Sequence, residues 1–314
     1  MNEYHILYTI DNNYFRHFMV SLVSLLEHNM KHRIFIHVVA DELTEENKKL
    51  LERTRLMYPN MVYELYDSKK ILDYMKQFNI KTYRGSVIPV YRLFFSLILK
   101  DIDRLLYIDS DTIIVNDLDL DNILFDKTIM ACIDHMPKSY IETLDTGIQT
   151  YFNSGVLLIN NKEFMNNNMF DEIIDTIRDN DKELKFFDQD ILNITFNGRI
   201  GILPLHYNIL SLDYYFKNVH QAFRKEFGYQ EFYSDEEIGY ALDNPVILHA
   251  TDIYGVRPWD DNCIHPFNDE YSKYYKMVYG NDIPRHQDLG KIIKTKFSKT
   301  KMLLKHYIDT HKHL

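Results

Sequence analysis

Hydrophobic residues gather in six short runs along the chain, and within each run they are continuous rather than alternating. The runs cover residues 5–10, 33–40, 61–67, 104–109, 129–134 and 155–160. Continuous hydrophobicity is typical of strands that are covered on both faces. Residues 14–28, 44–57 and 268–279 carry helical patterns instead. The alternation predicts an α/β fold with a largely parallel sheet flanked by helices, whose ligands bind beyond the carboxyl ends of the strands.

Two carboxylates, Asp109 and Asp111, lie in the otherwise apolar stretch YIDSDTIIV. Other D-x-D pairs occur, but they lack apolar runs on both sides. Carboxylates at a strand end can share a hard divalent cation that also holds a diphosphate. The alternatives are a turn with solvated acids and the aspartyl nucleophile of a magnesium phosphohydrolase. A calcium loop at 117–128 is rejected, because Asn122 and Thr128 replace its required Gly and Glu.

Further polar groups stand at predicted strand ends or helix starts. They are Asp11, Asn13 and Tyr14 after the first strand, Asn153 before the run at 155–160, Asp188 and Gln189 at a helix start, and His249 after an apolar run. Each has an ordinary structural interpretation as well. The first group could form a turn with a helix cap. Asp188, Gln189 and Asp190 could cap the helix that they open, and the histidine could be a structural one.

Composition narrows the class of protein. At 314 residues and 37.7 kDa, the chain can bury the core of one main domain. Two cysteines, Cys132 and Cys263, are too few for a disulfide framework and favour a reducing compartment, so we expect a cytoplasmic protein without a secretory signal. The net charge is -10. An acidic body without a basic and aromatic module argues against nucleic-acid binding.

The last thirty residues differ from the rest. Residues 285–314 hold eight Lys or Arg and two Asp, a charge of +6, so residues 1–284 carry -16. We therefore divide the chain into a catalytic domain, 1–284, and a basic tail, 285–314. The tail predicts a helix with one apolar stripe and an opposite lysine face; the stripe is Leu289, Ile293, Phe297, Leu304 and Ile308, and the face is Lys291, Lys294, Lys301 and Lys305. Such a helix could lie on an anionic membrane, dock on the body or bind a partner.

The segments described above, in order along residues 4–265, resemble the retaining nucleotide-sugar glycosyltransferases of family eight, which include bacterial lipooligosaccharide galactosyltransferases and the glycogenins. The resemblance implies a Rossmann-like fold of the GT-A type, a UDP-sugar donor and a divalent metal ion. Two positions depart from the family pattern. Arg257 stands where the family commonly has Lys before Pro-Trp, and Val90 replaces a frequent tyrosine.

The resemblance also assigns roles to residues of this chain. The uridine-binding turn would comprise Thr9, Asp11, Asn13 and Tyr14; the donor-side groups would be Arg92 on a helix, Ser110, Gly255 and Arg257; the metal ligands would be Asp109, Asp111 and His249; and the residues around the donor sugar and acceptor would be Asp134, Asn153, Asp188 and Gln189. Two oxygens and an imidazole nitrogen favour Mn²⁺, with Mg²⁺ as the alternative.

The expected activity is transfer of a hexose, glucose or galactose, from UDP to a hydroxyl of a glycan, a lipid-linked or a protein-linked acceptor, with retention at the anomeric carbon. Retention needs a covalent intermediate or attack on the face of departure. Gln189 is an uncharged amide and a poor nucleophile, so we favour same-face attack, with Asp188 as the alternative nucleophile. The segment 250–259 would close over the diphosphate and exclude water. A catalytically inactive UDP-sugar-binding protein is a further alternative.

Overall fold

The computed structural model describes residues 2–80, 86–125, 127–166, 169–180, 184–260, 264–284 and 289–311. Cys263 and the first four residues of the predicted tail lie outside these ranges. The strands are β1 (Glu3–Ile10), β2 (Arg33–Ala40), β3 (Met61–Asp67), β4 (Arg104–Ile108), β5 (Thr112–Ile114), β6 (Ile129–Ile133), β7 (Phe152–Asn160), β8 (Ile200–Ile202), β9 (Ile209–Leu210) and β10 (Ile247–His249).

The helices are α1 (Phe15–His28), α2 (Glu45–Met57), α3 (Lys69–Gln77), α4 (Ile88–Tyr91), α5 (Lys138–Leu144), α6 (Asn161–Asn166), α7 (Met169–Asp179), α8 (Phe187–Thr195), α9 (Ser211–Tyr215), α10 (His220–Phe227), α11 (Asp235–Asp243), α12 (Asn268–Tyr279) and α13 (Leu289–His311). Four short 3₁₀ turns are η1 (Phe95–Leu97), η2 (Leu120–Asn122), η3 (Leu205–Tyr207) and η4 (Lys217–Val219).

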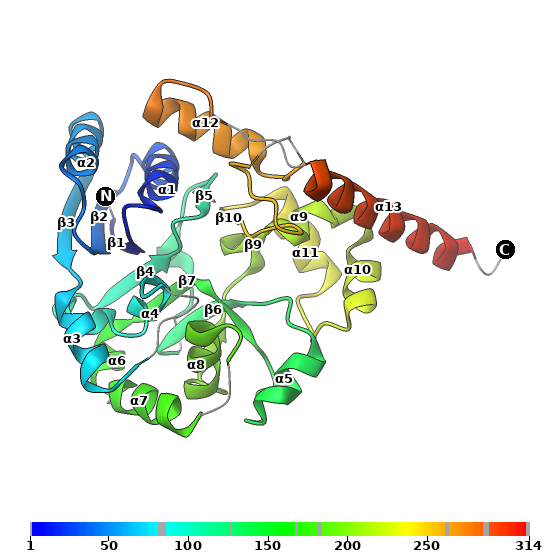
Figure 1. Ribbon diagram of the computed structural model, residues 1–314, viewed down its shortest axis with the longest axis horizontal. Coiled ribbons are helices and arrows are strands. Elements are labelled where there is room, and N and C mark those ends of the chain that lie inside the picture. The colour runs from blue at the N-terminus through cyan, green and yellow to red at the C-terminus, as the bar shows by residue number, and fades with distance from the viewer. Residues whose placement is uncertain are drawn as a thin grey trace.

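The main sheet has seven strands in the order β3-β2-β1-β4-β7-β6-β8. The first four are parallel to one another, β7 is antiparallel to both β4 and β6, and β6 is parallel to β8. Helices α1 and α2 lie on one side of this sheet, and α6, α7 and α8 lie on the other (Figure 1). The predicted α/β class with a mainly parallel, helix-flanked sheet is confirmed.

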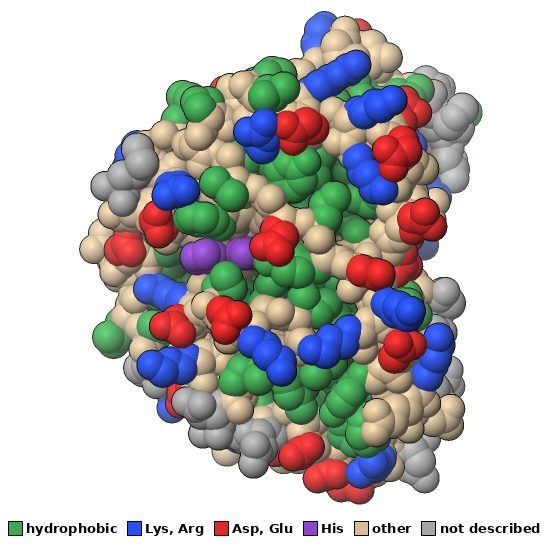
Figure 2. Space-filling view, turned by 90° about the vertical axis from the view of Figure 1, so that its left-hand side faces the viewer, with side chains coloured by type: hydrophobic (Ala, Val, Ile, Leu, Met, Phe, Trp, Pro, Cys, Tyr) green, Lys and Arg blue, Asp and Glu red, His purple; other side chains and the backbone are tan. Residues whose placement is uncertain are grey.

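Burial explains the continuous hydrophobic runs. Every residue of β6 is buried, as is all of β7 except its last; α6 and α8 pack against β7, and η3 packs against β6. At the edge, β3 is half solvated, with Val62 and Leu65 each more than a third exposed. The face of the molecule on that side carries basic and acidic side chains interspersed with apolar ones, without a patch of one sign (Figure 2).

A small second sheet, β5-β10-β9, determines where the site forms. Strand β5 starts directly after the acidic pair and pairs antiparallel with β10, so that His249 lies opposite Thr112. The amide of Ala250 then donates to the carbonyl of Asp111, 2.8 Å away. Pairing of two short strands therefore brings His249 beside the acidic pair, although 138 residues of chain separate it from Asp111.

Helix α13 extends along the side of the molecule beyond α10 (Figure 1). Thr295 and Met302 are buried against the body. The predicted apolar stripe points outward instead, with exposed fractions from 45% at Ile308 to 70% at Phe297. The side chain of Lys305 lies outside the described residues. Among the described helices, α13 included, none is both long and apolar enough to cross a membrane.

Candidate active site

The acidic pair occupies the turn between β4 and β5. Strand β4 ends at Ile108, and the amide of Asp109 donates to the carbonyl of Gly155 on β7, 2.8 Å away. The hydroxyl of Thr112 donates to the carbonyl of Asp109 and closes the turn. Asp109 and Asp111 both line a cavity of about 550 Å³. The turn therefore presents both carboxylates to one cavity rather than to bulk solvent.

His249 faces both carboxylates. Its Nε2 lies 3.3 Å from Asp111 Oδ1 and 3.8 Å from Asp109 Oδ2. Its Nδ1–H donates to Asn208 Oδ1, because the amide nitrogen of Asn208 is used in a bond to Asn153 Oδ1. The Nε2 lone pair is thereby directed at the carboxylates. Burial lowers the pKa of His249, but the two carboxylates outweigh it and raise the pKa overall.

Gly155 leaves the space that this imidazole occupies. A Cβ at that position would lie 2.2 Å from His249 Cε1 and 2.9 Å from Asp109 Oδ2. Real Cβ atoms essentially never approach other atoms closer than 3.0 Å. Absence of a side chain on β7 therefore allows the histidine and the carboxylate to approach each other.

Two arginines bind the acidic pair: Arg92 contacts both oxygens of Asp109, and Arg257 contacts the Asp111 oxygen that lies away from His249. Arg92 Nη2 lies 2.8 Å from Asp109 Oδ1, and Arg257 Nη1 lies 2.7 Å from Asp111 Oδ2. Burial raises the pKa of Asp111, but His249 and Arg257 outweigh it and hold the pKa well below its usual range. From the sequence, Arg92 is expected on a helix. In the structure Arg92 follows the last residue of the short α4 and caps its carboxyl end.

Arg92 also connects the acidic pair to the start of α8. Its Nε lies 3.1 Å from Asp188 Oδ2, and its Nη1 donates to the carbonyl of Ser154. Burial raises the pKa of Asp188 to about 6 against the opposing charge of Arg92. Gln189 is held at both ends, because its Oε1 accepts from the amide of Ser154 and its Nε2 donates to Asp134. These bonds fix the Gln189 amide relative to Asp188.

The segment after β1 forms the opposite wall of the cavity. Asp11 accepts hydrogen bonds from the amide of Tyr14 and the side chain of Asn13. These residues therefore form an ordinary turn and line the cavity as well. The ring of Tyr14 is 45% exposed. Thr9 lies within 3.2 Å of the Tyr107 hydroxyl, which donates to Asp109. The turn and the acidic pair are thus connected directly.

The cavity gathers most of the residues that the sequence suggests for the site. Lining it are Thr9, Asp11, Asn13, Tyr14, Arg92, Asp109, Ser110, Asp111, Asn153, Asp188, Gln189, His249 and Arg257. Asp134 lies behind this lining and bonds to Asn153 and Gln189. Gly255 does not line the cavity and lies against Lys291 of α13. Sequence reasoning missed Tyr107, Ser154, the space left by Gly155, and Asn208.

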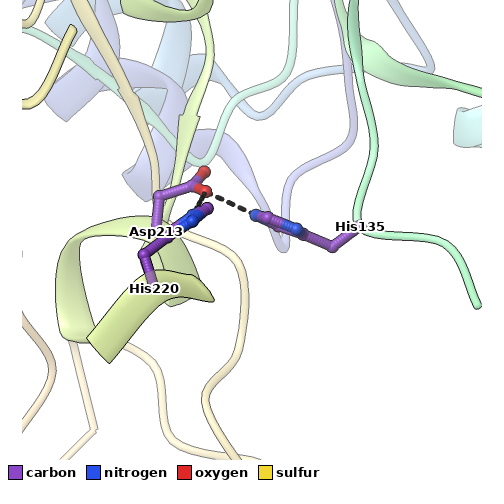
Figure 3. A group of neighbouring side chains, drawn as sticks. All are labelled: His135, Asp213 and His220. Atoms are coloured by element: carbon purple, nitrogen blue, oxygen red, sulfur yellow. Dashed lines mark hydrogen bonds and ion pairs between the residues drawn. The ribbon is translucent and has the colours of Figure 1, made fainter. Parts of the chain in front are cut away.

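A second cluster of ionisable side chains lies beside the site (Figure 3). His135 and His220 both point at the fully buried carboxylate of Asp213, on α9. Arg224 can only donate, so its contact of 3.1 Å makes Nδ1 of His135 an acceptor and puts the proton on Nε2, facing Asp213. A metal ion on Nε2 would leave an N–H facing that arginine. We therefore assign a hydrogen-bonded cluster that ties the loop after β6, next to Asp134, to α9.

The cluster of Asp109, Asp111 and His249 meets the requirements of a divalent metal site. One oxygen each of Asp109 and Asp111 and the free nitrogen of His249 lie within 4.8 Å of one another. The tautomer of His249 is fixed by Asn208, as is usual for a metal-ligating histidine. Any side chain at position 155 would enter the space that His249 and Asp109 occupy.

A doubly wound sheet with an acidic pair and arginines at the carboxyl ends of its strands defines the class: a glycosyltransferase of the GT-A fold. The model of the family "Glycosyl transferase family 8" matches residues 5–263, and the chain belongs to this family.

Individual relatives agree with that assignment. Over 290 residues the chain is 28% identical to the lipopolysaccharide 1,2-glucosyltransferase of Escherichia coli, covering 90% of this chain and 80% of the relative. The structure of the galactosyltransferase LgtC, in complex with donor and acceptor sugar analogs, matches with a TM-score of 0.66 at 20% identity, over 88% of this chain and 96% of that one. The bifunctional glycosyltransferase WbbM matches with a TM-score of 0.69 at 20% identity, over 90% of this chain and 52% of that one.

Proposed function

We propose that this protein is a metal-dependent, retaining hexosyltransferase that moves glucose or galactose from a UDP-sugar to a hydroxyl of a glycan, lipid-linked or protein-linked acceptor. The observation that carries the proposal is the convergence of Asp109, Asp111 and His249 on one point of a cavity that also holds two arginines. A bound divalent ion would supply positive charge that stabilises the departing diphosphate. Relatives named for glucosyl and for galactosyl transfer leave both hexoses open.

Donor binding would begin at the turn after β1. The exposed ring of Tyr14 offers a stacking surface for the base, and Asp11 and Asn13 offer polar groups to its edge. The diphosphate would then lie against Arg257, whose pKa is raised by Asp111 despite its burial. Trp259 packs on His17 of α1, with ring centroids 3.8 Å apart. This contact anchors the segment 250–259, which carries Arg257, beside the cavity. Exclusion of water follows, since hydrolysis is the competing reaction.

The residues around the anomeric carbon favour attack on the face of departure. The Gln189 amide already bonds to Ser154 and Asp134, and an amide is a poor nucleophile. The carboxylate of Asp188 is paired with Arg92, which lowers its nucleophilicity and orients it to hold sugar hydroxyls. The acceptor hydroxyl would attack, and its proton would pass to a phosphate oxygen of the leaving UDP. Trapping a glycosyl adduct on Asp188 would overturn this route.

The test of the function is a screen of UDP-sugars for slow hydrolysis without acceptor, with Mn²⁺, with Mg²⁺ and with neither. Water replaces the acceptor in this assay, so the preferred donor is identified alone. We expect one UDP-hexose to be hydrolysed with Mn²⁺. UDP binding without turnover in any donor would indicate a sugar-nucleotide-binding protein. Release of phosphate from simple phosphomonoesters, unaffected by loss of His249, would indicate the phosphohydrolase.

We also propose that the outward face of α13 contacts an anionic membrane. Leu289, Ile293 and Phe297 follow helical spacing there, and each is about two thirds exposed. Lys296 is exposed beside them, and each basic residue near an anionic surface contributes about 1 kcal/mol of attraction. Apolar groups flanked by lysines complement a negatively charged lipid surface. This contact would suit a lipid-linked acceptor and a location at the inner face of the cell membrane.

A further inference from the structure

The segment that carries Arg257 contains a tight hairpin. Ile253 and Val256 exchange two backbone hydrogen bonds of 2.9 and 3.0 Å. Tyr254 and Gly255 form its tip with φ values of +52° and +81°. Positive φ at both central residues defines a type I′ turn, which a tyrosine adopts at an energetic cost. Such a tip needs contacts elsewhere in the molecule to hold it.

Helix α13 supplies those contacts with its inner face. The stem of Lys291 covers Gly255, and Lys294 Nζ lies 5.9 Å from the centre of the Tyr254 ring. More than two turns further along α13, Met302 belongs to one buried apolar cluster with Ile253 of the hairpin, together with Tyr215, Phe216, Val219 and Phe223. Met302 and Ile253 are both almost completely inaccessible to solvent.

Helix α13 also contacts residues of the body outside the hairpin, on α9 and α10. The Tyr215 hydroxyl donates to the carbonyl of Thr295, and Lys299 Nζ lies 4.3 Å from the centre of the Tyr215 ring. Lys301 pairs with Glu226 of α10 at 3.6 Å. Helix α13 is therefore held independently of the hairpin, so it can act as a fixed support for it.

Arg257 connects the supported hairpin to the acidic pair. Val256 ends the hairpin, and the next residue, Arg257, reaches Asp111 and the carbonyl of Ala250 with one nitrogen. A shift of the hairpin would move the start of the Arg257 side chain with it. Misplacement of a positioning group by about 1 Å can cost 100-fold in rate.

We infer that α13 is a positioning element of the active site, which sets the place of Arg257 by supporting the hairpin at 253–256. Met302 is the positioning residue at the centre of this support. The helix thus has two separate faces, with the apolar stripe outward and the hairpin support inward. The inference rests on the proposed function only for the donor-binding readout described next.

The test compares two substitutions in the full-length protein, without vesicles. Met302→Ala removes the inner contact, and Leu303→Ala, at a residue 42% exposed on the same helix and outside the apolar stripe, is the matched control. We expect Met302→Ala to raise KM for the UDP-sugar by roughly 3- to 30-fold, with a smaller change in kcat. Leu303→Ala should change neither, and Met302→Leu should restore the wild-type KM.

A double-mutant cycle separates positioning from general destabilisation. In an Arg257→Ala background, Met302→Ala should cause no further rise in KM, because the group it positions is already absent. The same rise in both backgrounds would overturn the inference. Hydrogen exchange gives a readout without donor: Met302→Ala should speed exchange of the Ile253 and Val256 amides. Unchanged exchange refutes the support, whereas failure of the wild type to bind any UDP-sugar refutes the proposed function alone.

Discussion

Gly155→Ala is the substitution that tests the metal site most specifically, because it adds one methyl group and removes no ligand. The new Cβ would lie 2.2 Å from His249 Cε1, so the ring must withdraw by roughly 0.8 Å to reach the 3.0 Å limit of real Cβ contacts. The backbone of β7 cannot yield easily, since the carbonyl of Gly155 accepts from the amide of Asp109. The added atom therefore displaces two of the proposed metal ligands, His249 and Asp109.

The magnitude follows from that displacement. Changes that disturb the orientation of a metal-ligating histidine typically reduce metal affinity by about 10- to 100-fold, and overpacking of a close-packed site costs about 1–3 kcal/mol. We expect Gly155→Ala to reduce Mn²⁺ affinity, measured by calorimetry in the presence of UDP, by at least about tenfold, and to lower the free energy of unfolding by about 1–3 kcal/mol.

Gly239→Ala is the matched control, since a Cβ at that exposed position in α11 would meet nothing within 4 Å. It should leave Mn²⁺ affinity unchanged and stabilise the helix by about 0.5–1 kcal/mol. If Gly155→Ala bound Mn²⁺ and UDP as tightly as the wild type, His249 could not be a ligand in the observed position, and the proposed coordination would be wrong.

Three further predictions concern other parts of the molecule. Asn208→Ala removes the partner that orients His249 and should lower Mn²⁺ affinity in calorimetry by about 10- to 100-fold; unchanged affinity would mean that Asn208 does not fix the tautomer. Asp213→Ala leaves two buried imidazoles without their acceptor and should lower the free energy of unfolding in urea by about 2–6 kcal/mol, since each buried donor left unpaired costs about 1–3 kcal/mol; a loss below about 1 kcal/mol would contradict the buried cluster. The double variant Ile293→Ser, Phe297→Ser should no longer co-sediment with phosphatidylglycerol vesicles that bind the wild type; equal sedimentation of both would exclude the outward stripe as the membrane contact.

Strand positions could be predicted closely from the sequence because burial on both faces leaves a continuous apolar run. The run at 33–40 is β2, and that at 129–134 contains β6, every residue of which is buried. Strand direction was not predictable in the same way. The antiparallel course of β7 between β4 and β6 depends on pairing between residues 19 to 56 positions apart, and an apolar run has the same composition in either direction.

The proposed ligands could be suggested from sequence because each stands at an end of an apolar run: Asp109 and His249 end one, and Asp111 precedes one. Their supporting residues could not. Asn208 lies in no motif, and only the pairing of β9 with β10 brings it to His249. The tail shows the opposite limit: helical spacing identified the apolar stripe, but only the packing of Met302 shows that the stripe faces away from the body.

Above all, we propose that a metal ion held by Asp109, Asp111 and His249 binds the diphosphate of the donor. The most direct test of this binding is an anomalous difference map at the manganese absorption edge, from crystals grown with Mn²⁺ and UDP. We expect one strong peak between Asp109, Asp111 and His249, bridging to oxygens of both phosphates. A map with UDP bound in the cavity and manganese absent from these three side chains would contradict the proposal.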